Sequence, residues 1–63
     1  MEKELLHYLK NNPGLNNEDD IQNNLNVSSL SYLHNELQML KVKYPRNIGK
    51  LVSEDEIWWE YLQ

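Results

Sequence analysis

The sequence predicts a small, mainly α-helical domain that ends in a β-hairpin or in a fourth helix. Apolar residues recur at helical spacing in residues 2–11 and again, around a short polar break, in residues 21–44. The C-terminal block that follows is rich in β-branched and aromatic side chains. The 63 residues correspond to one domain, residues 1–63. Folding at this size buries only about 60% of the unfolded chain's surface, so stability depends on leucine and tryptophan packing or on self-association.

Residues 2–11 are expected to form the first helix. Leu5, Leu6 and Leu9 make its apolar side. The segment Asn12-Pro13-Gly14 ends it, because proline lacks an amide donor and glycine lets the chain turn. We expect His7 to be a surface residue, since nothing nearby supplies a second catalytic group.

The second helix is expected to begin after Asn17, whose side chain is a typical N-cap. The acids Glu18, Asp19 and Asp20 would then occupy the first turn, where the helix dipole favours negative charge. A metal site is the alternative for these acids, but three consecutive residues fan over about 200° of a helix and cannot converge on one ion. We therefore predict that they act in capping.

A third helix is expected over residues 28–44, joined to the second by a tight turn, which together make a helix-turn-helix. Asn26 can adopt the left-handed conformation that this turn needs, and Ser28 is the expected N-cap. An inward stripe follows at steps of three and four residues, namely Leu30, Leu33, Leu37, Leu40 and Tyr44.

The outward face of this third helix changes character along its length. Its N-terminal half carries serine and asparagine, which can hydrogen-bond base edges. Its C-terminal half leads into residues 37–53, which hold four cations and no acid, whereas residues 54–63 hold four acids and no base. Because the Debye length is about 8 Å at physiological salt, this basic patch can attract phosphate despite the net charge of −4. The alternative is that the four cations merely solvate a loop.

The pattern D-I-x-x-x-L-x-V-S-x-L-x-x-L-x-x-x-L-x-x-L from Asp20 to Leu40 resembles the second and third helices of winged helix-turn-helix DNA-binding domains. In that family the third helix enters the major groove and a following β-hairpin, the wing, contacts the DNA backbone. The resemblance implies base readout by the third helix, and the basic segment would hold phosphates. The predicted DNA-binding residues are Ser28, Ser29, Ser31, Tyr32, Asn35, Gln38, Lys41, Lys43, Arg46 and Lys50.

The resemblance also favours a C-terminal hairpin of residues 48–53 and 56–62 over a fourth helix. The helical alternative rests on a capping box, Ser53-x-x-Glu56, and on helical spacing after it. Two features depart from the family: Tyr44-Pro45 ends the third helix where a glycine is usual, and the tip of the wing is acidic. We therefore expect the tip to avoid DNA.

Two adjacent tryptophans in a strand point to opposite faces of the sheet. In the predicted hairpin, Ile57, Trp59 and Tyr61 share one face, and Trp58 and Leu62 share the other. One tryptophan should therefore pack on the helices, while the other lies near the surface as a candidate anchor for a homodimer.

The predicted function is that of a small, cytoplasmic, non-enzymatic DNA-binding protein that regulates transcription in a bacterium, phage or plasmid. Nine Asn and two Gly indicate an AT-rich genome. Two His, no Cys and no glycine-rich phosphate loop provide no catalytic residues, and no metal or cofactor is predicted. No run of about 18 apolar residues could cross a membrane, and the N-terminus lacks the order of a signal peptide.

The alternative function is a protein-interaction module, such as a phage-encoded adaptor or inhibitor of a host factor. Tyr32 and two apolar neighbours face outward on the third helix, and such patches often mark protein contacts. The interface candidates are Met39, Val42, Trp58 and Trp59. A third possibility is that the chain is a domain of a longer protein.

Overall fold

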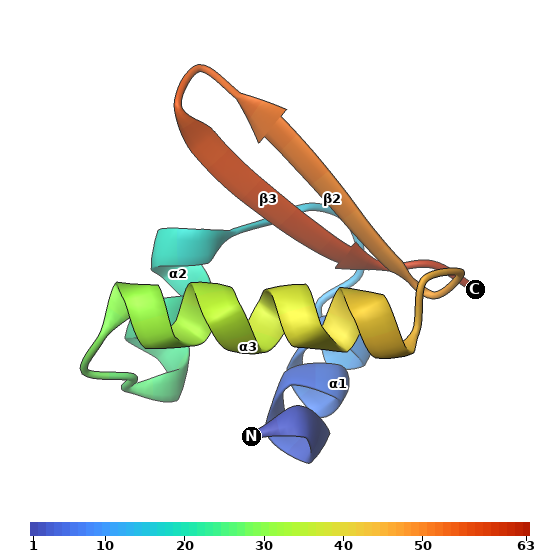
Figure 1. Ribbon diagram of the computed structural model, residues 1–63, viewed down its shortest axis with the longest axis horizontal. Helices are drawn as coiled ribbons and strands as arrows, with labels where there is room; N and C mark the ends of the chain where they lie inside the picture. Colours follow the sequence, from blue (N-terminus) through green and yellow to red (C-terminus); the bar gives the residue numbers. More distant parts are fainter.

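The computed structural model describes residues 1–63 as three helices followed by an antiparallel hairpin (Figure 1). The helices are α1 (Glu2–Asn11), α2 (Glu18–Leu25) and α3 (Leu30–Lys43), and the strands are β1 (Asn16–Asn17), β2 (Ile48–Ser53) and β3 (Glu56–Tyr61). This arrangement confirms the predicted fold class. None of the helices is long and apolar enough to cross a membrane.

The alternative of a fourth C-terminal helix is wrong. Alternation along β3 buries Trp59 completely and packs Ile57 and Tyr61 against the same core. Trp58 points to the opposite face and stays half-buried. This confirms the prediction that one tryptophan packs on the helices while the other lies near the surface.

Two of the predicted helix-end residues adopt the expected conformations. The Asn17 side chain accepts a hydrogen bond from the Asp19 amide at 2.8 Å and caps α2. Asn26 ends α2 in the left-handed region, with φ 54° and ψ 43°. The turn between α2 and α3 is therefore set by local chemistry.

The predicted start of α3 is wrong by one residue at the cap. Ser29, and not Ser28, is the N-cap: its hydroxyl accepts from the Tyr32 amide at 3.2 Å, and its carbonyl accepts from the Leu33 amide at 3.1 Å. Two consecutive serines precede the leucine stripe, so the sequence did not distinguish them. At the other end, Tyr44 is the C-cap and α3 ends at Lys43.

The core lies where the three helices meet the inner face of the hairpin. It contains eight buried side chains: Leu5, Leu9, Ile21, Leu33, Leu37, Leu40, Ile48 and Trp59. The stripe of α3 is thus confirmed at three positions. Leu30 departs from it and is 38% exposed, because it lines an open cavity beside Ile57 of β3.

The sheet has the strand order β1-β3-β2, and both pairings are antiparallel. Strand β1 was not predicted, because two asparagines have low strand propensity. Asn16 and Asn17 pair opposite Trp59 and Trp58. At the hairpin tip, Glu54 and Asp55 both have positive φ, 50° and 65°. Two such residues form a tight two-residue hairpin turn, which Asn-Gly usually occupies.

Candidate nucleic-acid interface

The face of α3 opposite its leucine stripe is polar in its N-terminal half and open to solvent. Ser31 and Asn35 are exposed, and Tyr32 is 52% exposed. Their side chains make no hydrogen bond within the protein, whereas the neighbouring Ser29 hydroxyl serves as the cap. Ser28 is also exposed, in the turn before α3. These predicted contact residues therefore present free donors and acceptors to solvent.

Gln38 differs from the other predicted base-reading residues, because it faces the hairpin. Its Oε1 accepts a hydrogen bond from Lys50 Nζ of β2 at 3.1 Å. The same ammonium lies 5.4 Å from the centroid of the Trp59 ring, within the range of a cation–π contact. Gln38 thus positions Lys50 beside α3, and its Oε1 is already engaged within the protein.

The predicted cations differ in how far the protein itself compensates their charge. Lys41 Nζ donates to the Ile48 carbonyl at 3.1 Å, and Lys50 donates to an amide, so both bond neutral groups and keep their net charge. Arg46 is exposed in the turn after α3 and makes no ion pair. Three of the four cations are therefore free to attract phosphate.

Lys43 is the cation whose charge is compensated. Its Nζ lies 2.9 Å from Glu2 Oε1, and the Tyr44 hydroxyl donates to Glu2 Oε2, also at 2.9 Å. The hydrogen bond from Lys43, followed by that from Tyr44, lowers the pKa of Glu2. The same contacts with Glu2 raise the pKa values of Lys43 and Tyr44. Lys43 would have to leave Glu2 to hold a phosphate.

All four cations lie around the C-terminal half of α3, but on different sides of it. Lys41 and Lys50 lie toward the hairpin, whereas Lys43 reaches α1. The hairpin tip, with its exposed acids Glu54 and Asp55, stands clear of α3 (Figure 1). Negative charge at the tip is therefore separated from the cations.

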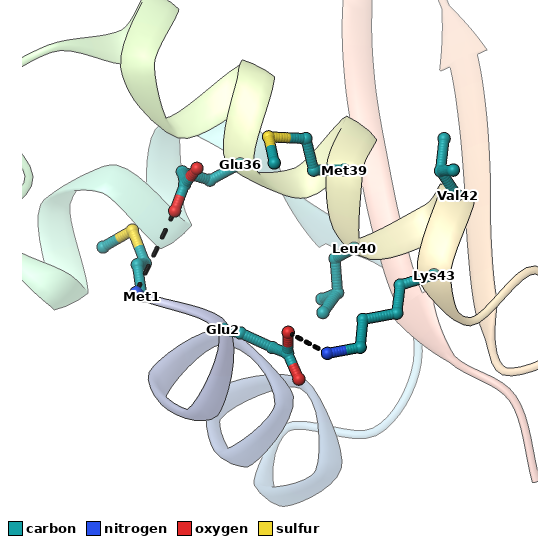
Figure 2. Close-up of a pocket in the computed structure, with 7 residues that line it drawn as sticks. All are labelled: Met1, Glu2, Glu36, Met39, Leu40, Val42 and Lys43. Carbon is teal, nitrogen blue, oxygen red and sulfur yellow. Dashed lines mark hydrogen bonds and ion pairs between the residues drawn. The ribbon is translucent and has the colours of Figure 1, made fainter.

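Apolar side chains interrupt the outward face of α3 in its C-terminal half. Met39 is 65% exposed and Val42 is 81% exposed. They border a cavity of about 390 Å³ between α3 and the start of α1, and Figure 2 shows Lys43 reaching across it to Glu2. The Met1 amino group and Glu36 form a second, longer ion pair there, at 3.9 Å. The exposure of Met39 and Val42 suits their role as interface candidates.

The prediction that Trp59 is an interface residue is wrong. Trp59 is completely buried, and its Nε1 donates to Glu18 Oε2 at 2.7 Å. Trp58 remains available: it pairs across the hairpin with Leu51, which is exposed on the outer face of the sheet.

Sequence reasoning missed a polar cluster under the start of α3. Glu18, predicted in the first turn of α2, is only 6% exposed. Its Oε2 lies 3.0 Å from His34 Nδ1 and also accepts the Trp59 indole bond. Sixteen residues separate Glu18 from His34 and 41 separate it from Trp59, so no local spacing indicated the contact.

The arrangement as a whole combines free hydrogen-bonding side chains on α3 with uncompensated cations on α3, in the turn after it and on β2. No family model, curated protein or solved structure matches this chain. The chemistry of α3 and its surroundings is therefore the basis for a functional proposal.

Proposed function

We propose that the protein binds double-stranded DNA as a small, non-enzymatic, winged helix-turn-helix transcriptional regulator of a bacterium, phage or plasmid, and acts in the cytoplasm. One observation carries the proposal: Ser31, Tyr32 and Asn35 are exposed on α3 and make no side-chain bond within the protein. An α-helix fits the major groove, where Asn can bond adenine through two hydrogen bonds and Ser can contact several bases. In this proposal α3 lies in the groove with these side chains toward the bases.

The cations supply the attraction to phosphate in this proposal. Lys41, Arg46 and Lys50 retain their net charge, because none of them pairs with an acid. Three phosphate contacts would give a plot of log K against log salt with a slope of about −2.7. We therefore expect modest affinity and a clear loss of binding as salt increases.

In this proposal the hairpin does not contact DNA through its tip. The acids at the tip repel phosphate, so the tip stays away from the duplex. The hairpin acts through its middle instead, because β2 holds Lys50 beside α3. A homodimer through the outer face of the sheet, with Trp58 and Leu51 in contact, would present two copies of α3 to DNA.

A chemical-shift titration with duplex DNA of mixed sequence, at low and at moderate salt, tests the proposal. We expect perturbations in residues 28–50, largest near Asn35, and we expect them to shrink as salt increases. Shifts that avoid α3 at both salt concentrations would contradict the proposal.

A second candidate function, protein interaction, is favoured by the exposure of Met39 and Val42. Together with Tyr32 they put apolar surface on α3 where a base-reading helix would carry polar side chains. An adaptor or inhibitor of a host protein would use this surface. Replacing Met39 with Ser separates the two functions: binding to a protein partner should fall, whereas binding to DNA through Asn35 should persist.

A further inference from the structure

A cavity of about 510 Å³ lies between the first turns of α3 and the inner face of β3. Its lining consists of Glu18, Leu30, Ser31, His34, Asn35 and Ile57. Cavities that hold small organic molecules have volumes of about 300–1,000 Å³. The space is therefore sufficient for a small ligand or for a long side chain of a partner.

The Glu18 carboxylate lines this cavity with one unpartnered oxygen. Both of its side-chain bonds use Oε2, which accepts from Trp59 Nε1 and lies 3.0 Å from His34 Nδ1. No fully buried side-chain oxygen in the protein lacks a partner, so Oε1 is open to solvent, and Glu18 is one of the residues that line the cavity. Water can therefore bond Oε1, and a charged donor that entered the cavity would replace that water with a charge-assisted hydrogen bond.

The other polar groups of the cavity are also able to accept hydrogen bonds. In neutral His34, the Nδ1 that faces Glu18 carries the proton, which leaves Nε2 as an acceptor. The Ser31 hydroxyl and the Asn35 carbonyl oxygen are free acceptors, since neither side chain is bonded within the protein. The lining thus combines one negative charge, several acceptors and the apolar side chains of Leu30 and Ile57.

We propose that this cavity binds a guanidinium group. A guanidinium is a planar cation with five donors, and it is more weakly hydrated than an ammonium, so it suits a partly enclosed carboxylate surrounded by acceptors. Its alkyl chain would pack on Leu30 and Ile57. The group comes either from a small guanidino compound or from an arginine of a partner polypeptide. The site shares Ser31 and Asn35 with the proposed DNA-binding face, but guanidinium binding is measured without DNA.

The Trp59 indole N–H resonance reports on the site, because this group is bonded to Glu18. A Trp58→Phe variant assigns the resonance. We expect saturable shifts of the Trp59 indole and the Ser31 amide on titration with propylguanidine and with Nα-acetyl-arginine amide, with a Kd of about 1 mM. Tighter binding of the amide supports a polypeptide source, and equal binding supports a free guanidino compound. Nα-acetyl-citrulline amide, which has nearly the same shape but no charge, should cause no saturable shift.

Matched variants distinguish binding in the cavity from a general attraction between the ligand and the acidic protein. Glu18→Gln should weaken binding at least about tenfold, because a charge-assisted hydrogen bond is lost. Asp19→Asn removes the same charge from the adjacent, exposed position and should leave the Kd unchanged. If Glu18→Gln does not fold, Asn35→Ala at the rim should still weaken binding about fivefold. Equal shifts with the citrulline compound, an equal loss in Asp19→Asn, or no shift with either guanidinium would overturn the proposal.

Discussion

The Glu18 carboxylate and the Trp59 indole, 41 residues apart in the chain, meet at an Oε2 to Nε1 distance of 2.7 Å. This hydrogen bond ties the first residue of α2 to the centre of β3. His34 of α3 contacts the same carboxylate oxygen, and its ring lies edge-on to Trp59 at a centroid distance of 6.3 Å. One carboxylate thus joins three elements that the sequence keeps apart.

Trp59→Phe should destabilise the protein by about 2–3 kcal/mol, because it leaves a small cavity in the core and removes the indole donor from a buried carboxylate. Urea unfolding followed by circular dichroism measures the change. Trp58→Phe is the matched control and should cost less than about 1 kcal/mol, since Trp58 is only half-buried. Equal losses in the two variants would contradict the role assigned to Trp59.

The contacts of Glu2 should make stability depend on pH at both ends of the scale. The pKa of Glu2 is lowered in the folded protein. Ionised Glu2 therefore stabilises the fold above its unfolded-state pKa near 4.5, and this stabilisation is lost as the pH falls through the folded-state pKa. The pKa values of Lys43 and Tyr44 are raised, so their contributions are present below about 10 and are lost as the pH rises through the folded pKa values.

Unfolding of the wild type and of Glu2→Gln over a pH series tests this linkage. The difference in free energy of unfolding should be greatest near neutral pH and should shrink toward both extremes. Glu4→Gln, at an exposed position of α1 without an ion pair, should show no such profile. A difference for Glu2→Gln that is constant with pH would refute the linkage.

Asn35→Ala should weaken DNA binding by about 1–3 kcal/mol at the preferred sequence and relax the preference at one base position. Its stability should stay within about 0.5 kcal/mol of the wild type, because the side chain is exposed and unbonded. Asn23→Ala on α2 is the matched control and should bind as the wild type does. Competition binding with duplexes of varied sequence provides the measurement.

Lys50→Gln should weaken binding on every DNA sequence and make the salt slope shallower by about 0.9, because one phosphate contact is lost. Lys43→Gln should have a smaller effect, because Glu2 already compensates Lys43. Lys3→Gln, on the exposed side of α1, serves as the control for net charge. A larger loss of DNA binding in Lys43→Gln than in Lys50→Gln would show that Lys50 is not the more important phosphate contact.

Replacing Glu54-Asp55 by Asn-Gly should stabilise the protein by about 1 kcal/mol, because a left-handed conformation is costly for Glu54 and glycine is preferred at the second position of such a turn. Urea unfolding measures the gain. DNA binding should not decrease, since the change removes two acids from the tip. An unchanged or lower stability would contradict the assigned turn strain.

Local chemistry explains which features the sequence could predict. The Asn17 cap, the left-handed Asn26 and the buried Leu33, Leu37 and Leu40 follow from neighbouring residues. The hairpin is favoured over a fourth helix mainly by the family resemblance, because its local sequence fits both. The features that were missed depend on contacts between distant segments: β1 exists only because β3 lies beside it, and Glu18 is buried only because Trp59 and His34 reach it. The turn of Gln38 toward Lys50 likewise required the position of β2.

The position of Lys50 over the Trp59 ring gives the protein an intrinsic optical signal. The ammonium imposes an electric field on the indole, and a phosphate that drew Lys50 away would change that field and shift the fluorescence emission of Trp59. In a Trp58→Phe background the emission comes from Trp59 alone. Engagement of the hairpin by a ligand can then be followed without attaching any dye.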